Sequence, residues 1–232
     1  MSPVSLTIFL VNHQQLLSGN KKQNMSERKQ ENRLLLILSV LLFLSGVLLP
    51  ELIGFLSFDY NSMSNYLSEL GAVGAEYSRI INYFGFVPTA FSALIIALLL
   101  QSKLSNTRLS RAGLLLIGSG VFIGYFGAFI FPCDYGCPAE GSFSQNMHNN
   151  LGLIYYLIIP VGLFVLGIGL RKEPMIINSS ISFGATFVFL LGFFMMLNPN
   201  QIDLLGLWQR LADYTVVVFL IFMSLFVKGE SR

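Results

Sequence analysis

The sequence predicts an all-α membrane protein, a polytopic bundle of six transmembrane helices. Two features of the chain indicate this class. First, 54% of the 232 residues are hydrophobic and only 11% are charged, which leaves too few polar side chains to cover a water-soluble globule of this size. Second, the apolar residues gather in runs of about 20, and because lipid satisfies no backbone hydrogen bond, such runs must cross a bilayer as helices.

Six runs meet this length, some of them only when they are extended by a helical turn. Their bounds are 34–58, 80–100, 113–131, 151–170, 175–197 and about 207–227. Pro50 and Glu51 interrupt the first run. Pro88 and Pro160 lie within the second and the fourth, where each proline frees a backbone carbonyl and can kink its helix.

The third run contains a row of small residues. Its glycines recur at steps of seven, four and three, which places them along one helical face: Gly113, Gly120, Gly124 and Gly127. Since small residues allow helix backbones to approach closely in lipid, we expect this helix to lie at the centre of the bundle. A ligand groove along the same face is the alternative interpretation.

The chain divides into a polar, basic leader (1–33), a transmembrane domain (34–227) and a short tail (228–232). The apolar run "LTIFLV" in the leader is short, and it lacks both a preceding basic residue and a small-residue cleavage site, so it does not predict a signal peptide. Met25 opens the stretch "MSERKQENR", which is typical of a cytoplasmic leader. We therefore expect residues 1–24 to be disordered or the product of a mis-assigned start.

The distribution of charge predicts the orientation. If the six spans alternate, 12 of the 14 Lys and Arg residues lie on one side of the membrane, in 1–33, 101–112, 171–174 and 228–232. The positive-inside rule places that side, with both termini, in the cytoplasm and the protein in the inner membrane. The expected partner is thus the lipid bilayer, with lipid headgroups or an envelope protein as further candidates, and no nucleic acid.

The opposite side receives the residues with the richest chemistry. It holds 8 of the 12 acidic residues, both cysteines, His148 and the single Trp, on connections that are longer than those of the basic side. A functional site is therefore predicted to face outward. The sequence contains no Walker loop, dinucleotide fingerprint or HExxH motif, and we expect no metal and no other cofactor.

The connection between the third and fourth spans, "FPCDYGCPAEGSFSQNMHNN", contains two cysteines and a histidine. Cys133 and Cys137 are four positions apart with Gly136 between them, on the side that we expect to be oxidising, and we predict a disulfide. The spacing to His148 matches no common zinc pattern, so a metal site is the less favoured alternative, together with free thiols.

His148 lies where this connection becomes the fourth helix. Beside Asp134 or Glu69 its imidazole would act as a base, a proton carrier or a ligand. The simpler alternative is a polar residue at the wet end of a helix. The stretch "GLWQRLADY" offers a similar choice, because Arg210 either pairs locally with Asp213 and reaches the headgroups, or holds an anionic group of a ligand.

Four separated stretches together resemble a family of prokaryotic six-span membrane proteins, the domain-of-unknown-function family 998. They are "LSELGA" after the first span, "FPCD" at the end of the third, "MH" at the start of the fourth and "GLWQRL" entering the sixth. Their order and their spacing relative to the spans carry the resemblance, which covers about residues 35–227.

This resemblance implies a six-helix fold, and it implies no reaction, because the activity of the family is not established. It places seven residues on the family's motifs: Ser68, Glu69, Gly71, Asp134, His148, Gln209 and Arg210. The cysteine pair departs from the family pattern, which favours a local disulfide over shared ligands.

Two functions of different classes follow. The first is an enzyme that acts on a lipid or lipid-linked group at the outer leaflet, with a candidate catalytic cluster of Glu69, Asp134, His148 and Arg210. The second is a non-enzymatic protein: a small transporter, a sensor or a membrane partner. Transport is the less favoured, because the predicted span centres contain no ionisable residue.

Overall fold

The structure, a computed structural model, describes residues 25–104, 107–171 and 175–226. In this part of the chain the fold is entirely helical, and six helices are long and apolar enough to span a membrane. Their bounds are Met25–Leu56, Ser78–Leu104, Arg108–Ile130, Phe143–Gly169, Ile176–Met196 and Pro199–Leu225. The predicted fold class is therefore confirmed. Residues 1–24, for which we expected disorder or a mis-assigned start, and the tail 228–232 lie outside the described residues.

The spans contain shorter elements as well as α-helices. In chain order these are η1 (Leu44–Leu48), α2 (Leu49–Leu56), η2 (Leu67–Gly71), α3 (Ser78–Ile80), η3 (Ile81–Phe86), α4 (Val87–Leu104), α5 (Arg108–Ile130), α6 (Phe143–Gly169), α7 (Ile176–Met196), η4 (Pro199–Leu204) and α8 (Leu205–Phe226).

Two of the three span prolines follow a π-helical turn. The turn η1 ends two residues before Pro50, and η3 ends two residues before Pro88. Because proline has no N–H to offer, the carbonyls behind it need other donors. In the wider turn before each proline, the Leu49 N–H reaches the Leu44 carbonyl and the Val87 N–H reaches that of Asn82, both five residues back. Pro160 lies inside the continuous helix α6.

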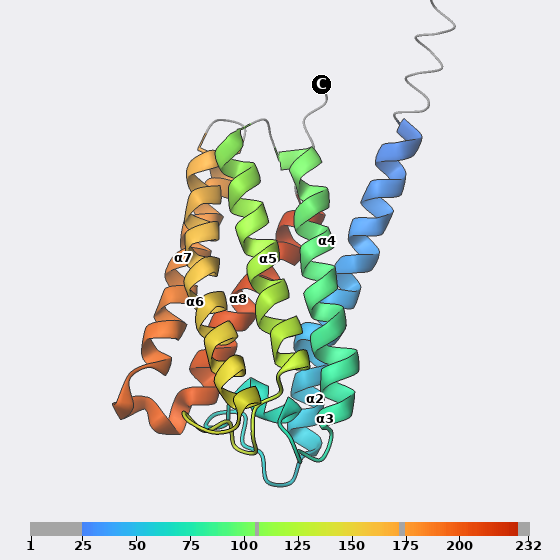
Figure 1. Ribbon diagram of the computed structural model, residues 1–232. Coiled ribbons are helices and arrows are strands. Elements are labelled where there is room, and N and C mark those ends of the chain that lie inside the picture. Colours follow the sequence, from blue (N-terminus) through green and yellow to red (C-terminus); the bar gives the residue numbers. More distant parts are fainter. Residues whose placement is uncertain (1–24, 105–106, 172–174, 227–232) are drawn as a thin grey trace, which may run out of the picture.

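The glycine face of α5 packs against α6, and α5 lies between α4 and α6 (Figure 1). A Cβ atom at Gly113 would lie 2.6 Å from the backbone nitrogen of Leu166. One at Gly120 would lie 2.8 Å from the Ile159 side chain. Helices α5 and α6 therefore contact each other at the glycines of α5, as predicted for a central helix.

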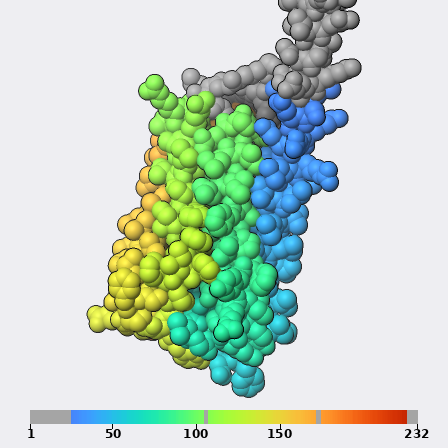
Figure 2. Space-filling view, turned by 45° about the vertical axis from the view of Figure 1, so that its right-hand side comes forward, coloured from blue at the N-terminus to red at the C-terminus, as the bar shows by residue number. Residues whose placement is uncertain are grey.

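The two ends of the bundle differ. The described ends of the chain, near residues 25 and 226, lie at the same end (Figure 1). The other end, which we call the long-loop end, carries residues 57–77, 131–142 and 197–204. Figure 2 shows one face of the bundle, on which the first span borders α4 and α4 borders α5. The long-loop end is where the predicted site residues lie.

We expect Gly113→Ala to destabilise the bundle, because the added methyl group would meet the Leu166 backbone, which cannot rotate away. A cost of about 1–3 kcal/mol is typical of such overpacking. The measurement is the midpoint of thermal unfolding in detergent. Gly184→Ala is the matched control, because nothing lies within 4 Å of a Cβ there. Equal midpoints for the two variants would contradict the close packing.

Candidate functional site

At the long-loop end, three connections are held together by backbone groups. The Val73 N–H donates to the Cys133 carbonyl at 2.8 Å, and the Leu207 N–H donates to the Met63 carbonyl at 3.0 Å. The side-chain oxygen of Gln209 accepts a hydrogen bond from the Leu67 N–H. Segments that are far apart in the sequence are thus joined at this end of the bundle. We call the three connections, residues 57–77, 131–142 and 197–204, the cap.

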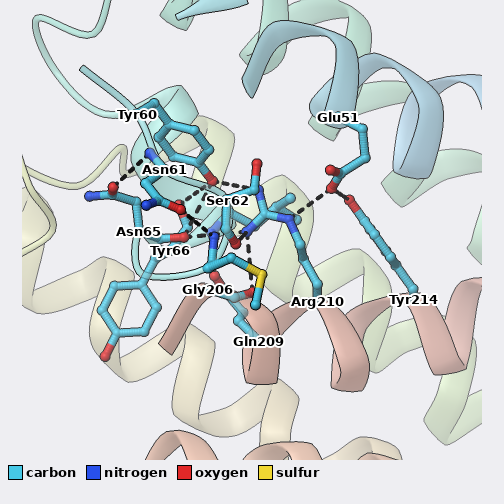
Figure 3. Close-up of polar contacts among 12 residues, drawn as sticks. Glu51, Tyr60, Asn61, Ser62, Asn65, Tyr66, Gly206, Gln209, Arg210 and Tyr214 are labelled. Carbon is cyan, nitrogen blue, oxygen red and sulfur yellow. Dashed lines mark hydrogen bonds and ion pairs between the residues drawn. The ribbon is translucent and has the colours of Figure 1, made fainter. Parts of the chain in front are cut away.

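Arg210 is the centre of a polar network beneath this cap (Figure 3). Its Nε donates to Glu51 at 2.7 Å, and its Nη2 donates to the Tyr60 hydroxyl at 2.6 Å. Its Nη1 is shared among three backbone carbonyls, those of Ser62, Asn65 and Gly206. The guanidinium group is therefore used to hold protein groups.

The ion pair of Arg210 is formed with Glu51 of the first span, and not with Asp213 as the local interpretation expected. The reason is that the long side chain of Arg210 reaches across to the interruption in the first span. Burial raises the pKa of Tyr60 to about 12, so its hydroxyl stays protonated. This hydroxyl donates a hydrogen bond to the Tyr66 carbonyl at 3.0 Å.

Glu69 caps the short helix η2. Its carboxylate accepts hydrogen bonds from the Tyr66 N–H at 2.7 Å and from the Asn65 side-chain amide at 2.8 Å. This capping arrangement satisfies donors that the helix start leaves free. Gly71, at the other end of η2, lets η2 approach η3, since a Cβ there would lie 2.6 Å from the Phe86 ring. The motif "SELG" thus has a structural function.

Asp134 holds the connection between α5 and α6. Its two carboxylate oxygens accept from the N–H and the hydroxyl of Ser142, both at 2.8 Å. Its own N–H donates to the side chain of Gln145, which is buried in the first turn of α6. The hydrogen bonds from the Ser142 backbone and side chain lower the pKa of Asp134, because they stabilise the charged form.

Cys133 and Cys137 form the predicted disulfide. The Ser68 hydroxyl lies 3.5 Å from Cys137 Sγ. The two sulfurs and a ring nitrogen of His148 lie within 4.8 Å of one another. A disulfide sulfur offers no thiolate, so these three residues could hold a metal ion only after the bond is reduced.

His148 is half-buried, and one of its two ring nitrogens forms a hydrogen bond within the protein. Nδ1 lies 3.0 Å from the Phe131 carbonyl. Because a carbonyl only accepts, Nδ1 carries the proton, and in the neutral ring Nε2 keeps a lone pair. A histidine held in this tautomer can accept a proton from a ligand.

Two adjoining hollows meet at His148. The first, which we call the wide groove, has a volume of about 470 Å³. The second, which we call the inner cavity, has a volume of about 60 Å³ and extends into the bundle as far as Asp213. The two hollows have five lining residues in common: Ser68, His148, Gly152, Tyr156 and Gln209. Three family-motif positions therefore meet at one place.

Asp213 and its tyrosines were missed by the sequence analysis. Asp213 is 3% exposed, and its Oδ1 accepts from the hydroxyls of Tyr155 at 3.0 Å and Tyr156 at 3.1 Å. The sequence indicated that the span centres contain no ionisable residue. Asp213 lies within the predicted sixth span, near the start of α8, where the sequence analysis considered it only as a local partner of Arg210. The signal that could have found this group is an acid within the sixth apolar run, Asp213, together with the pair Tyr155 and Tyr156 within the fourth.

The four candidate catalytic residues are not joined to one another. Within residues 25–104, 107–171 and 175–226, no hydrogen bond or ion pair links any two of Glu69, Asp134, His148 and Arg210. Glu69 lines a separate surface cavity of about 370 Å³. Asp134 and Arg210 are not among the residues that line the wide groove or the inner cavity.

We expect Arg210→Gln to lower the stability of the protein. The change removes the partner of Glu51 and leaves several carbonyls with fewer donors. A cost of about 2–3 kcal/mol is less than that of a fully buried pair, because the Glu51 side chain is 40% exposed. Thermal unfolding measures it, with exposed Arg79→Gln as the control. If both variants unfold together, Arg210 does not hold the cap.

The lowered pKa of Asp134 predicts a pH dependence. A carboxylate with a depressed folded pKa stabilises the fold above its ordinary pKa near 4, and this contribution is lost as the pH falls through the folded value. We expect Asp134→Asn to unfold at a lower temperature than the wild type at pH 6, with a gap that narrows as the pH falls below the ordinary carboxyl pKa near 4. Glu140→Gln in the same connection is the control and should show no such gap.

Comparison with known proteins agrees with this architecture. A family model described as "Protein of unknown function (DUF998)" matches residues 34–225. No curated protein and no solved structure matches the chain. The matched segment contains every residue of the wide groove and the inner cavity. The chain is therefore a multi-pass membrane protein that belongs to the DUF998 family.

Proposed function

We propose that this protein binds an amphiphilic molecule, a lipid or a lipid-linked group, in the wide groove and that His148 acts on it as a general base. The observation that carries this proposal is the composition of the groove. One wall is apolar and is built by α6 and α7, both of which are candidate membrane spans. The other wall is polar and contains three of the residues that the family resemblance singled out, Ser68, His148 and Gln209.

The apolar wall supports a ligand that comes from the bilayer. It includes Leu153, Phe193, Met196 and Leu197, of which Leu153 and Leu197 are also exposed on the outside of the bundle. An acyl chain could therefore lie along these side chains without leaving the apolar phase. The groove volume of about 470 Å³ lies in the range that small-molecule sites occupy.

The polar wall supports chemistry on the headgroup. Ser68, His148 and Gln209 offer a hydroxyl, an imidazole and an amide at the junction of the two hollows. His148 Nε2 is the group that can take a proton from a bound water or hydroxyl. We assign positioning roles to the other three candidates: Glu69 shapes η2, Asp134 shapes the connection to α6, and Arg210 holds the cap.

We also propose that the long-loop end faces the outside of the inner membrane, with both termini in the cytoplasm. The 12 of 14 basic residues predicted on the opposite side support this orientation. A reporter that is active only in the cytoplasm, fused to the C-terminus, should be active. Activity of a reporter that needs the outside would reverse the orientation.

Filling the groove tests the binding step. Gly152 lines both hollows, and nothing lies within 4 Å of a Cβ built there, so Gly152→Leu should fill the groove without disturbing the fold. We expect mass spectrometry of the purified protein to find lipid retained by the wild type and lost from this variant. Gly184→Leu, also in open space, is the matched control and should retain lipid. Equal retention by both variants would contradict the proposal.

The catalytic step is tested by His148→Gln, which keeps a hydrogen-bonding side chain and removes the base. In liposomes of host lipid extract, we expect conversion of lipid to fall at least about 100-fold, as is typical when a general base is lost. Lipid retention should be unchanged. Equal conversion by variant and wild type, or no conversion by either, would remove the catalytic role and leave the binding role.

Transport is a second candidate, favoured by one observation. Asp213 is a buried carboxylate within a candidate span, which is where coupled transporters keep ionisable groups. Flux of an amphiphile across liposomes that is lost in Asp213→Asn, without chemical conversion, would favour transport over catalysis.

A further inference from the structure

Asp213 is a buried carboxyl group that forms no ion pair within the described residues. Its carboxylate is 3% exposed and bonds only to neutral hydroxyls, those of Tyr155 and Tyr156. The nearby ion pair joins Arg210 to Glu51 and does not include Asp213. Arg210 acts on Asp213 only at longer range, because its guanidinium group is paired with Glu51. In such a site the charged form of a carboxyl group is stabilised when a positive charge meets it, and without one the protonated form is favoured.

The space next to Asp213 is lined by aromatic rings. The inner cavity is bounded by Phe86, Tyr125, Tyr155 and Tyr156. The ring centroids of Phe86 and Tyr125 are 5.8 Å apart, and those of Tyr125 and Tyr155 are 6.2 Å apart, both edge to face. Aromatic faces attract cations, and several rings around one position form the cages that proteins use to bind organic ammonium groups.

A buried acceptor completes the cavity. The Tyr125 side chain is 5% exposed, and its hydroxyl oxygen has no hydrogen-bond partner. A buried hydroxyl without a partner is rare and points to a missing group. Its oxygen can accept a hydrogen bond from an ammonium N–H, as can the second carboxylate oxygen of Asp213.

We propose that the inner cavity binds the ammonium group of an amphiphile, whose apolar part lies in the wide groove. This inference rests on the proposed function, and it names the class of ligand. The carboxyl group of Asp213 and the aromatic rings favour a positive donor over a neutral or anionic head, and the oxygen of Tyr125 can accept a hydrogen bond from that donor. A small volume of about 60 Å³ suits a primary ammonium group.

The test uses two probes with the same alkyl chain, dodecylamine and dodecanol, and native mass spectrometry of the full chain in detergent. We expect the wild type to bind dodecylamine at least about tenfold more tightly than dodecanol. Asp213→Asn should abolish this preference while dodecanol still binds. Asp203→Asn, which removes an exposed acid at the same end of the bundle, should keep it.

Tyr125→Phe provides a second variant, because it keeps the ring and removes only a hydroxyl that makes no hydrogen bond. It should fold like the wild type and lower the preference for dodecylamine by several-fold. If Asp213→Asn does not fold, this variant decides, and an unchanged preference overturns the proposal.

The outcomes separate this inference from the proposed function. Equal binding of both probes by the wild type overturns the ammonium site and leaves a groove for amphiphiles. Binding of neither probe overturns both. If sodium ions raise the unfolding temperature of the wild type but not of Asp213→Asn, and dodecylamine shows no preference, the cavity is an alkali-cation site and the ammonium proposal is wrong.

Discussion

The guanidinium group of Arg210 connects parts of the chain that no apolar contact would hold in register. It bonds to the first span through Glu51, to the following connection through Tyr60 and two backbone carbonyls, and to its own helix through Gly206. In lipid, helices gain little from apolar burial against one another, so hydrogen bonds and close packing set their arrangement. Arg210 therefore holds the cap together with the backbone hydrogen bonds and Gln209.

Close helix packing and the inner cavity use the same face of α5. Gly113 and Gly120 let α5 touch α6 through their backbones. Gly124 packs against Tyr155 and also lines the inner cavity. The glycine row is therefore a packing face that borders the inner cavity at Gly124. The cavity lies beside Gly124, where the facing side chain of α6 is the ring of Tyr155. At Gly120 the facing side chain of α6 is the aliphatic Ile159.

The candidate site combines groups of different origin. Ser68, His148 and Gln209 come from three connections and helix starts, and their position depends on the cap. Asp213 belongs to the interior of a span, and the tyrosine hydroxyls of α6 hold it. A ligand that touched both sets would have one end in the apolar wall and its polar end at a buried carboxylate. This is the physical basis of the proposed amphiphile site.

The sequence by itself determined the class of fold, the six spans, the packing face of α5 and the disulfide. These depend on local composition and spacing, because lipid forces a long apolar run into a helix and a short separation brings two cysteines together. It also indicated His148, Ser68 and Gln209 through motif positions. The predicted cluster of Glu69, Asp134, His148 and Arg210 remains untested as a catalytic set.

Only the tertiary structure decided which polar groups meet. The bond from Leu67 to Gln209 and the pair of Arg210 with Glu51 join residues that are 142 and 159 positions apart. No local pattern specifies such contacts, because they depend on how each helix is rotated and how deeply it lies in the bundle. Asp213 was missed for the same reason: its environment is made by the rings of α6, and periodicity in α8 carries no information about them.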